Sequence, residues 1–261
     1  MLRALWRYRE FVFAMVRRDF TSRYLGSLLG GLWALLTPLA TILVYLVIFS
    51  AVMKGRMPGS TDSLDYGIFL CTGILIWTFF AEVISRCQST FVENANLLKK
   101  LSFPRITLPV IVLLSATLNF LLVAAVFLLL LVVLGRFPGV AILACVPLIA
   151  IQQGLALGIG ILLGTLHVFF RDIGQIWLVV VNLWFWVTPI VYVPEVLPEA
   201  TRSWIRYNPL SHLFLAYQGV VLRNEWPDWQ SLLYPGLLAV LLLAIGLKVF
   251  RTLSGEMVDE L

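Results

Sequence analysis

Arginines crowd the first 23 residues of the chain, and they are its side chains best suited to bind an anion. They are Arg3, Arg7, Arg9, Arg17, Arg18 and Arg23. A guanidinium group offers phosphate or carboxylate oxygens a planar fork of N–H donors. Apolar residues such as Phe11 and Val16 separate these arginines, so residues 3–24 predict an interfacial helix whose arginines face anionic head groups. The alternative is a plain basic anchor that fixes the orientation of the first membrane span.

Aromatic side chains in the apolar segments could contact a hydrated, sugar-like ligand. The candidates are the aromatic residues Tyr45, Phe49, Trp77, Trp184 and Trp186, together with the amide residue Asn182. Ring faces stack on sugars, and an amide such as that of Asn182 can satisfy hydroxyl groups. Trp184 and Trp186 lie near the middle of their segment, where an interfacial aromatic belt is a weaker explanation.

Several other kinds of chemistry are missing from the sequence. There is no G-x-x-x-x-G-K-[ST] motif and no Gly-Lys pair, so no loop could cradle the phosphates of a nucleotide. His167 and His212 are the only histidines and are far apart, which argues against a metal site. The three cysteines, Cys71, Cys87 and Cys145, are an odd number without paired spacing, so the sequence implies no disulfide framework. The sequence therefore predicts no catalytic machinery, no metal and no cofactor in this chain.

The composition is that of a membrane protein. Of 261 residues, 61% are hydrophobic and 13% are charged, against roughly half and a quarter in a soluble domain. Apolar runs bounded by charges, Pro or Gly predict six helical spans, because lipid leaves no partner for open backbone groups. The spans are 29–53, 66–85, 107–134, 140–167, 175–193 and 231–250. We expect an all-α integral membrane protein with one transmembrane domain over residues 1–261.

The distribution of positive charge predicts the orientation. If the N-terminus is cytoplasmic, inner segments hold 13 of the 19 lysines and arginines and outer segments hold 6. This bias places both termini in the cytoplasm. It also explains the net charge of +5 without nucleic-acid binding.

Two loops differ from simple connections. The inner loop 86–105 predicts a short amphipathic helix, because its residues Val92, Asn96, Leu97, Lys99, Lys100 and Leu101 fit that pattern. This helix could receive force from a cytoplasmic partner, or the segment could be an ordinary basic loop. The outer loop 194–223 predicts two short helices near 196–206 and 210–222, punctuated by prolines. They could dip back into the membrane and close an exit, or lie on the outer leaflet.

Glu82 and Arg86 are one helical turn apart and can form an ion pair, either structural or part of a gate. Small residues recur at i, i+4 in Gly26/Gly30, Gly154/Gly158 and Gly160/Gly164. Such pairs let helices approach closely. They indicate packing within one subunit or a dimer seam.

Four sequence patterns resemble those of the membrane-spanning permeases of polysaccharide-exporting ABC transporters, which export O-antigen, capsular polysaccharide and teichoic acid. In chain order they are Arg17-Arg18-Asp19-Phe20 with Arg23-Tyr24, Gly30, Trp33 and Thr37-Pro38; Asn96-Leu97-Leu98-Lys99-Lys100 with Phe103-Pro104-Arg105 and Pro109; Phe170-Arg171-Asp172-Ile173; and Asn208-Pro209. They are spread over nearly the whole chain.

The resemblance implies an assembly and a substrate. The assembly is a homodimer in the bacterial inner membrane with two copies of a cytoplasmic ABC ATPase, which carries the ATP and magnesium. The substrate is a polysaccharide linked to undecaprenyl diphosphate, which passes through a channel that the two permease subunits share.

The resemblance also implies residue roles. Residues 93–101 form the coupling helix that docks on the ATPase, with Asn96, Leu97, Leu98, Lys99, Lys100 and Phe103 as contacts. The helices of 194–223 form an outer gate that includes Asn208, Pro209, His212, Phe214 and Tyr217. The diphosphate head group would meet Arg7, Arg9, Arg17, Arg18 and Arg23, and the polysaccharide would meet the aromatic candidates given above.

Two other functions fit the same sequence. One is an ABC permease of the same architecture that exports a small amphiphile or drug. The other is an integral-membrane enzyme that acts on lipid-linked sugars, although it would lack an acidic or metal-binding cluster.

Overall fold

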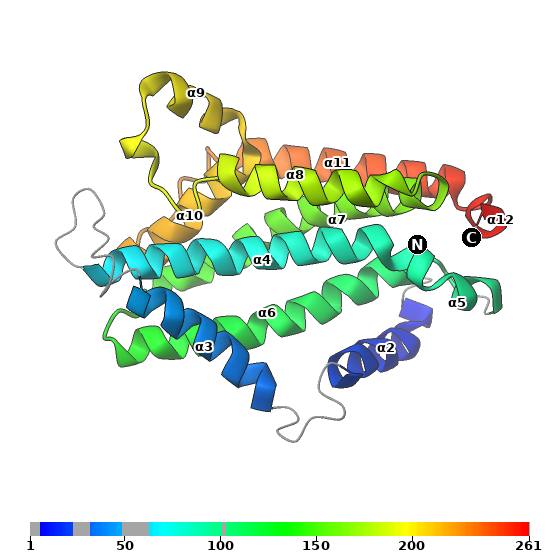
Figure 1. The fold of residues 1–261 in the computed structure, drawn as a ribbon, viewed down its shortest axis with the longest axis horizontal. Helices are drawn as coiled ribbons and strands as arrows, with labels where there is room; N and C mark the ends of the chain where they lie inside the picture. Colours follow the sequence, from blue (N-terminus) through cyan, green and yellow to red (C-terminus); the bar gives the residue numbers. More distant parts are fainter. Residues whose placement is uncertain (1–5, 23–31, 49–62, 101–102, 261) are drawn as a thin grey trace.

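The computed structural model describes residues 6–22, 32–48, 63–100 and 103–260, and every regular element within these ranges is a helix (Figure 1). The all-α prediction is therefore confirmed for the described part of the chain. The predicted site residues Arg23 and Phe49, and the Gly26/Gly30 pair, lie outside the described residues.

Four helices are long and apolar enough to cross a membrane. They are α4 (Ser63–Glu93), α6 (Thr107–Val133), α7 (Cys145–Phe169) and α11 (Leu233–Leu253), and a 3-10 segment, η3 (Gly139–Ala144), leads directly into α7. About 20 residues at 1.5 Å per residue cover the hydrocarbon core. Four of the six expected spans thus correspond to helices that are long and apolar enough to cross a membrane.

The other two expected spans correspond to shorter apolar helices. Helix α3 (Trp33–Val47) has 15 residues and α8 (Asp172–Val187) has 16. Residues 29–31 and 49–53 of the first expected span lie outside the described residues. Six spans therefore stay a prediction.

The core of the bundle is built on α7, which packs between α4 and α11. Glycines allow this approach, because a Cβ atom on Gly158 would lie 2.5 Å from the backbone nitrogen of Leu243 on α11. On the other face of α7, a Cβ atom on Gly164 would lie 2.5 Å from the carbonyl oxygen of Cys87 on α4. The Gly154/Gly158 and Gly160/Gly164 patterns thus include contacts within one subunit.

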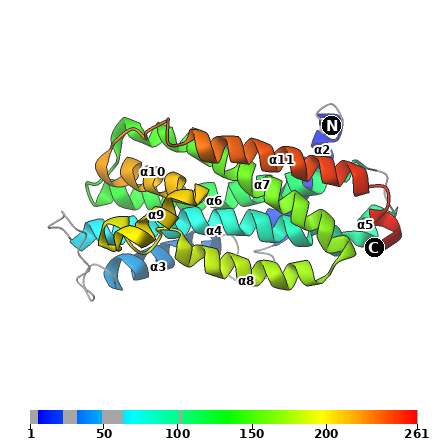
Figure 2. The ribbon, with the colours of Figure 1, turned by 90° about the horizontal axis from the view of Figure 1, so that it is seen from above.

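Helices α3 and α8 lie at the periphery. In Figure 2, α11 lies on one side of α4 and α7, and α8 on the other. Helix α8 is tied to α4 by the indole N–H of Trp177, which donates to the Ser85 hydroxyl at 2.9 Å. Helix α3 packs on α4 and α6.

One end of the bundle carries α2 (Arg9–Ser22), α5 (Ala95–Lys100) and α12 (Met257–Glu260), and we call it the basic end because Arg17, Arg18, Lys99 and Lys100 lie there (Figure 1). Helix α2 packs on α6 through the buried side chains of Val12 and Val16. The first and last described helices therefore lie at the same end of the molecule.

The opposite end of the bundle is formed by two short connections, one between α6 and η3 and one before α9, and by the two outer helices α9 and α10. Gly135 and Gly139 adopt positive φ angles of 68° and 61° where the chain passes from α6 into η3, a backbone conformation that glycine adopts without strain. Helix α9 (Glu199–Tyr207) stands at the surface after a short turn, η4 (Pro194–Val196). Helix α10 (Pro209–Arg223) is largely buried against α4, α7 and α11.

Candidate functional site

A groove of about 430 Å³ lies between α3, α4 and α6. Its lining combines aromatic rings with polar side chains, namely Trp33, Tyr45, Phe79, Phe120, Thr37, Thr41, Thr78, Glu82 and Asn119. Polar groups inside otherwise apolar helices are costly unless they meet a partner, water or a ligand. We call this feature the α3–α4–α6 groove, and Tyr45 is the predicted pore residue that borders it.

Two other predicted pore residues point into the subunit instead. The ring of Trp77 lies 5.6 Å from that of Phe185 and 6.3 Å from that of Phe214, and Phe80 packs edge-on against Trp184 at 5.6 Å. Trp77 and Trp184, expected in the pore, therefore share one aromatic cluster with Phe214, expected in the outer gate.

Asn182 and Trp186 lie on a different face, the exposed side of α8. The Trp186 side chain is 64% exposed, and the Asn182 amide donates only to the Leu178 carbonyl of its own helix, at 2.7 Å. Both residues lie on a surface that the described part of this subunit leaves uncovered, although the Trp186 ring contacts the aromatic cluster at its edge, through Phe185 at 5.4 Å.

The Asn208 side chain joins α8 to α10 through four hydrogen bonds, of which the one that Nδ2 donates to the Val187 carbonyl is the longest at 3.5 Å. Its Oδ1 accepts from the Trp184 indole at 3.0 Å and caps α10 by accepting from the Leu210 backbone N–H at 3.1 Å. Its Nδ2 donates to the Thr188 hydroxyl at 3.0 Å. Pro209 follows at the first helical position, where the missing N–H costs nothing.

The remaining gate candidates hold α10 in the bundle. The buried Tyr217 hydroxyl donates to Gln152 Oε1 at 2.8 Å, and Gln152 Nε2 donates to the Ile76 carbonyl at 3.0 Å. His212 Nε2 lies 2.9 Å from the Arg206 carbonyl oxygen, and its ring packs edge-on against Tyr234. The structure thus connects α10 with α7 and α4 and, through His212, with α9 and α11.

Helix α5 occupies most of the predicted coupling segment. Leu98 is buried in a cluster that includes Phe91 and Met257, and Phe103 packs on Phe11 of α2 with ring centres 5.2 Å apart. The remaining candidates are more accessible: Leu97 is half-buried, whereas Asn96, Lys99 and Lys100 are exposed. Two apolar side chains anchor the segment, and its polar side chains are free to meet a partner protein.

The described arginines of the N-terminal region, Arg7, Arg9, Arg17 and Arg18, are all exposed. The Arg9 guanidinium lies 5.3 Å from the centre of the Trp6 ring. Because Val12 and Val16 face α6, helix α2 is amphipathic, as the sequence predicts.

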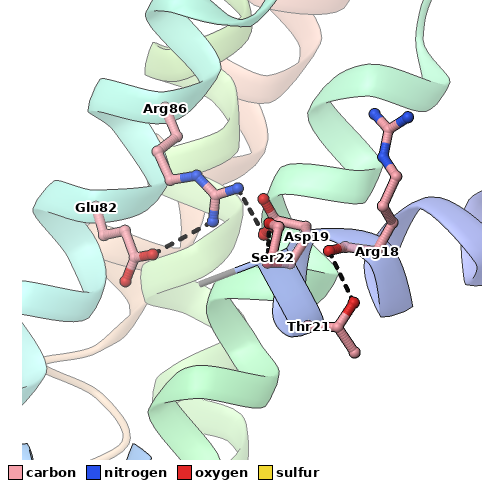
Figure 3. A network of polar contacts seen from close by, with 6 residues as sticks. All are labelled: Arg18, Asp19, Thr21, Ser22, Glu82 and Arg86. Atoms are coloured by element: carbon pink, nitrogen blue, oxygen red, sulfur yellow. Dashed lines mark hydrogen bonds and ion pairs between the residues drawn. The ribbon is translucent and has the colours of Figure 1, made fainter. Parts of the chain in front are cut away.

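A polar network ties α2 to α4 (Figure 3). Arg86 Nη2 donates to Asp19 Oδ2 at 2.8 Å, and Arg86 Nη1 donates to Glu82 Oε1 at 3.3 Å. The Glu82–Arg86 pair is the one that the spacing predicts, whereas Asp19 and Gln152 were missed as site residues. The sequence holds a signal for each of them. Asp19 follows two arginines directly, and Gln152 is an amide within an apolar span. Polar side chains in such places usually have a specific hydrogen-bond or ion-pair partner within the protein.

Among the described residues, no group of His, Cys, Asp and Glu is arranged to hold a metal ion. The described residues offer three features that could act in function: the α3–α4–α6 groove, the half-buried ionic network of Asp19, Glu82 and Arg86, and helix α5 with its exposed lysines.

Comparison with known proteins shows similarity along nearly the whole chain. The sequence profile of the ABC-2 type transporter family matches residues 10–222. An O-antigen export system permease protein RfbA from Klebsiella pneumoniae is 31% identical, over 94% of this chain and 92% of that protein. The Myxococcus xanthus protein of the same name is 28% identical over 100% of this chain and 99% of its own length. The polysialic acid transport protein KpsM of Escherichia coli is 24% identical over 95% of both chains.

Proposed function

The chain belongs to the ABC-2 type transporter family, and on that premise we propose that it is the permease subunit of an ATP-driven polysaccharide exporter. Family membership and the four long apolar helices make it a multi-pass membrane protein and a transport subunit whose ATP is hydrolysed by a partner. The observation that carries the substrate assignment is the nearly full-length similarity to O-antigen export permeases. The similarity to a polysialic acid transport protein supports the same assignment, because that relative is named for the transport of another long polymer.

We infer that two copies of the chain form the channel. A polymer needs a continuous path, and the six helices expected for one subunit would barely enclose one. Exposed apolar side chains on α3 and α8, including Val44, Val47, Leu183 and Trp186, are available to a second copy or to lipid. In the dimer, the α3–α4–α6 groove would offer hydroxyl, amide and aromatic groups to passing sugars.

The outer helices would act as the gate of that channel. The burial of α10 and its hydrogen bonds to α7 support a segment that dips back into the membrane rather than resting on it. Helix α9 is amphipathic and exposes Trp204 and Tyr207, which suits the outer interface.

The basic end would face the cytoplasm, with both termini on that side of the bacterial inner membrane. Helix α5 would dock on the ATPase, of which each exporter would hold two copies. The exposed arginines of α2 would attract the diphosphate of an undecaprenyl-linked polysaccharide.

The test is reconstitution of the chain with its ATPase partner in lipid vesicles. We expect an undecaprenyl-linked polysaccharide to stimulate ATP hydrolysis and to be moved across the bilayer. Stimulation by small amphiphiles alone would contradict the polysaccharide assignment and favour a drug exporter. Turnover of a lipid-linked sugar without the ATPase would contradict transport itself.

Coupling through α5 is tested with matched charge reversals. Lys99→Glu changes an exposed residue of α5, and Lys248→Glu changes an exposed lysine of α11 at the same end. We expect Lys99→Glu to lower the amount of glycan exported per ATP several-fold, while Lys248→Glu leaves the ratio near that of the unmodified protein. Equal ratios in the two variants would remove Lys99 from the coupling surface.

A further inference from the structure

Arg86 lies where two cavities approach each other. The first is the α3–α4–α6 groove, whose lining includes Glu82. The second, of about 240 Å³, lies between α2, α4 and α6. Its polar lining combines two arginines and two carboxylates with neutral side chains, namely Arg18, Arg86, Asp19, Glu93, Ser22, Thr90 and Asn94. We call it the basic-end cavity. The Arg86 guanidinium bridges Glu82 of one lining and Asp19 of the other (Figure 3).

The bonding of Arg86 is incomplete for an arginine in such a place. The Arg86 side chain is only 27% exposed, yet its guanidinium donates one hydrogen bond to each of the two carboxylates, and the one to Glu82 is long at 3.3 Å. An arginine that holds its preferred anion makes two parallel N–H···O bonds to it. The guanidinium therefore has donor capacity that neither carboxylate uses in a paired manner.

Asp19 is the replaceable member of the network. It lies near the end of α2, a surface helix of which only Val12 and Val16 are buried. Glu82 and Arg86 lie on successive turns of α4, which is the most buried of the long helices. A shift of α2 would separate Asp19 from Arg86, whereas Glu82 would stay with it.

We propose that Arg86 is a phosphate-binding residue and that Asp19 occupies its anion position until a phosphate group displaces it. A bound phosphate would then lie between the basic-end cavity and the groove, at the entrance to the path proposed for the sugars. The inference rests on the proposed function for the source of the phosphate, the diphosphate of a lipid-linked polysaccharide. Arg18 also lines the basic-end cavity, but Figure 3 shows its guanidinium directed away from Arg86, so the assignment is made for Arg86.

Competition and simple structural pairing predict opposite results for one substitution. If the ion pair only holds α2 in place, loss of either partner damages the same contact, and both variants change binding in the same direction. If Asp19 competes with phosphate, its neutralisation strengthens phosphate binding, whereas loss of Arg86 weakens it.

The experiment measures binding of radiolabelled undecaprenyl diphosphate to the permease–ATPase complex in nanodiscs of zwitterionic lipid. We expect Arg86→Gln to weaken binding about 10- to 100-fold, the equivalent of losing charge-assisted hydrogen bonds. Asp19→Asn should strengthen binding about 3- to 10-fold, because a neutral amide competes less well for a guanidinium. Arg86→Lys should fall between Arg86→Gln and the unmodified protein, since lysine keeps the charge without the fork.

The matched control is Arg136→Gln. Arg136 pairs with Asp65 of the same helix α4 at 3.6 Å, but at the opposite end of the bundle. It should leave binding unchanged. Thermal unfolding of each complex separates a folding defect from a binding defect, and the sign of the Asp19→Asn effect decides the matter even if Arg86→Gln does not fold.

The proposal is overturned if Asp19→Asn and Arg86→Gln weaken binding alike, or if neither changes it. Competition with unlabelled lipids identifies the source of the phosphate. Displacement by undecaprenyl diphosphate but not by phosphatidylglycerol supports a carrier site, and equal displacement supports a phosphate site filled by membrane phospholipid. A failure of the proposed function shows separately, as loss of glycan export in vesicles while the opposite effects on phosphate binding persist.

Discussion

At the scale of single residues, the hydrogen bonds of Asn208 show how one side chain can fix two helices. The residue caps α10, accepts the indole N–H of Trp184 on α8 and donates to Thr188 at the end of α8. Asn208 is buried, so water cannot replace these bonds if the amide is removed. The position of the outer helix α10 therefore depends on an amide beside the aromatic cluster.

Asn208→Ala should destabilise the subunit by about 2 kcal/mol. It removes a helix cap and leaves the N–H of Trp184 without its partner. Thermal unfolding in detergent, followed by tryptophan fluorescence, measures the change. Asn182→Ala is the matched control, because the exposed Asn182 amide contacts only its own helix, and it should shift the midpoint little. Equal shifts in the two variants would refute the role given to Asn208.

The sequence predicted residue types at the candidate site better than their grouping. Tyr45, Trp77, Trp184 and Asn208 were all singled out, but the structure divides them between a groove and a buried cluster. The direction of a side chain on a buried helix depends on neighbours that local spacing does not identify. Asp19 was missed for the same reason, since its partner Arg86 lies 67 positions away in the sequence.

At the scale of helices, α7 is held by glycine contacts on two faces. Gly160 and Gly164 face α4, and Gly158 faces α11. In a membrane, close packing of this kind replaces the hydrophobic driving force that holds soluble bundles together. Larger side chains at these positions would force the backbones apart.

Gly164→Ala should therefore destabilise the α4–α7 contact by about 1–3 kcal/mol, the usual cost of overpacking. The new Cβ atom would lie 2.5 Å from the carbonyl oxygen of Cys87, and the backbone there cannot move alone. Gly236→Ala on α11 meets nothing within 4 Å and should be neutral or stabilise by up to about 1 kcal/mol. Denaturation midpoints that do not separate the two variants would contradict this packing argument.

Helix boundaries were predicted well where hydrophobic runs are long. The expected spans at 107–134 and 231–250 nearly match α6 and α11, whereas α4 extends eight residues beyond its expected end at residue 85, to Glu93. The expected span ends at charged residues, but α4 continues through Arg86, whose guanidinium pairs with Asp19 and Glu82 within the protein. Hydropathy detects the membrane boundary and not the end of the helix.

At the scale of the whole molecule, the distribution of charge and the placement of the short helices distinguish the two ends of the bundle. The α2, α5 and α12 helices gather at the basic end, and α9 and the Gly135–Gly139 turn lie at the other. This arrangement is the one that a positive-inside protein with cytoplasmic termini requires.

The polarity predicts which residues a membrane-impermeant thiol reagent can reach in intact spheroplasts. Lys100 and Glu225 are both exposed and lie at opposite ends. With the three native cysteines replaced by alanine, we expect labelling of Glu225→Cys at once and of Lys100→Cys only after permeabilisation. The reverse order would contradict the proposed orientation.

The central position of α7 has a consequence for the order in which the protein is made. The most extensive described contact of helix α4 is with α7. The ribosome delivers α4 to the membrane before α7 exists, so the nascent chain must hold an incompletely partnered helix while α6 is inserted. Helix α11 then packs on the opposite face of α7. Biogenesis of this subunit is therefore completed late, and chains released before α7 would leave the α7-facing side of α4 open to lipid and to quality-control proteases.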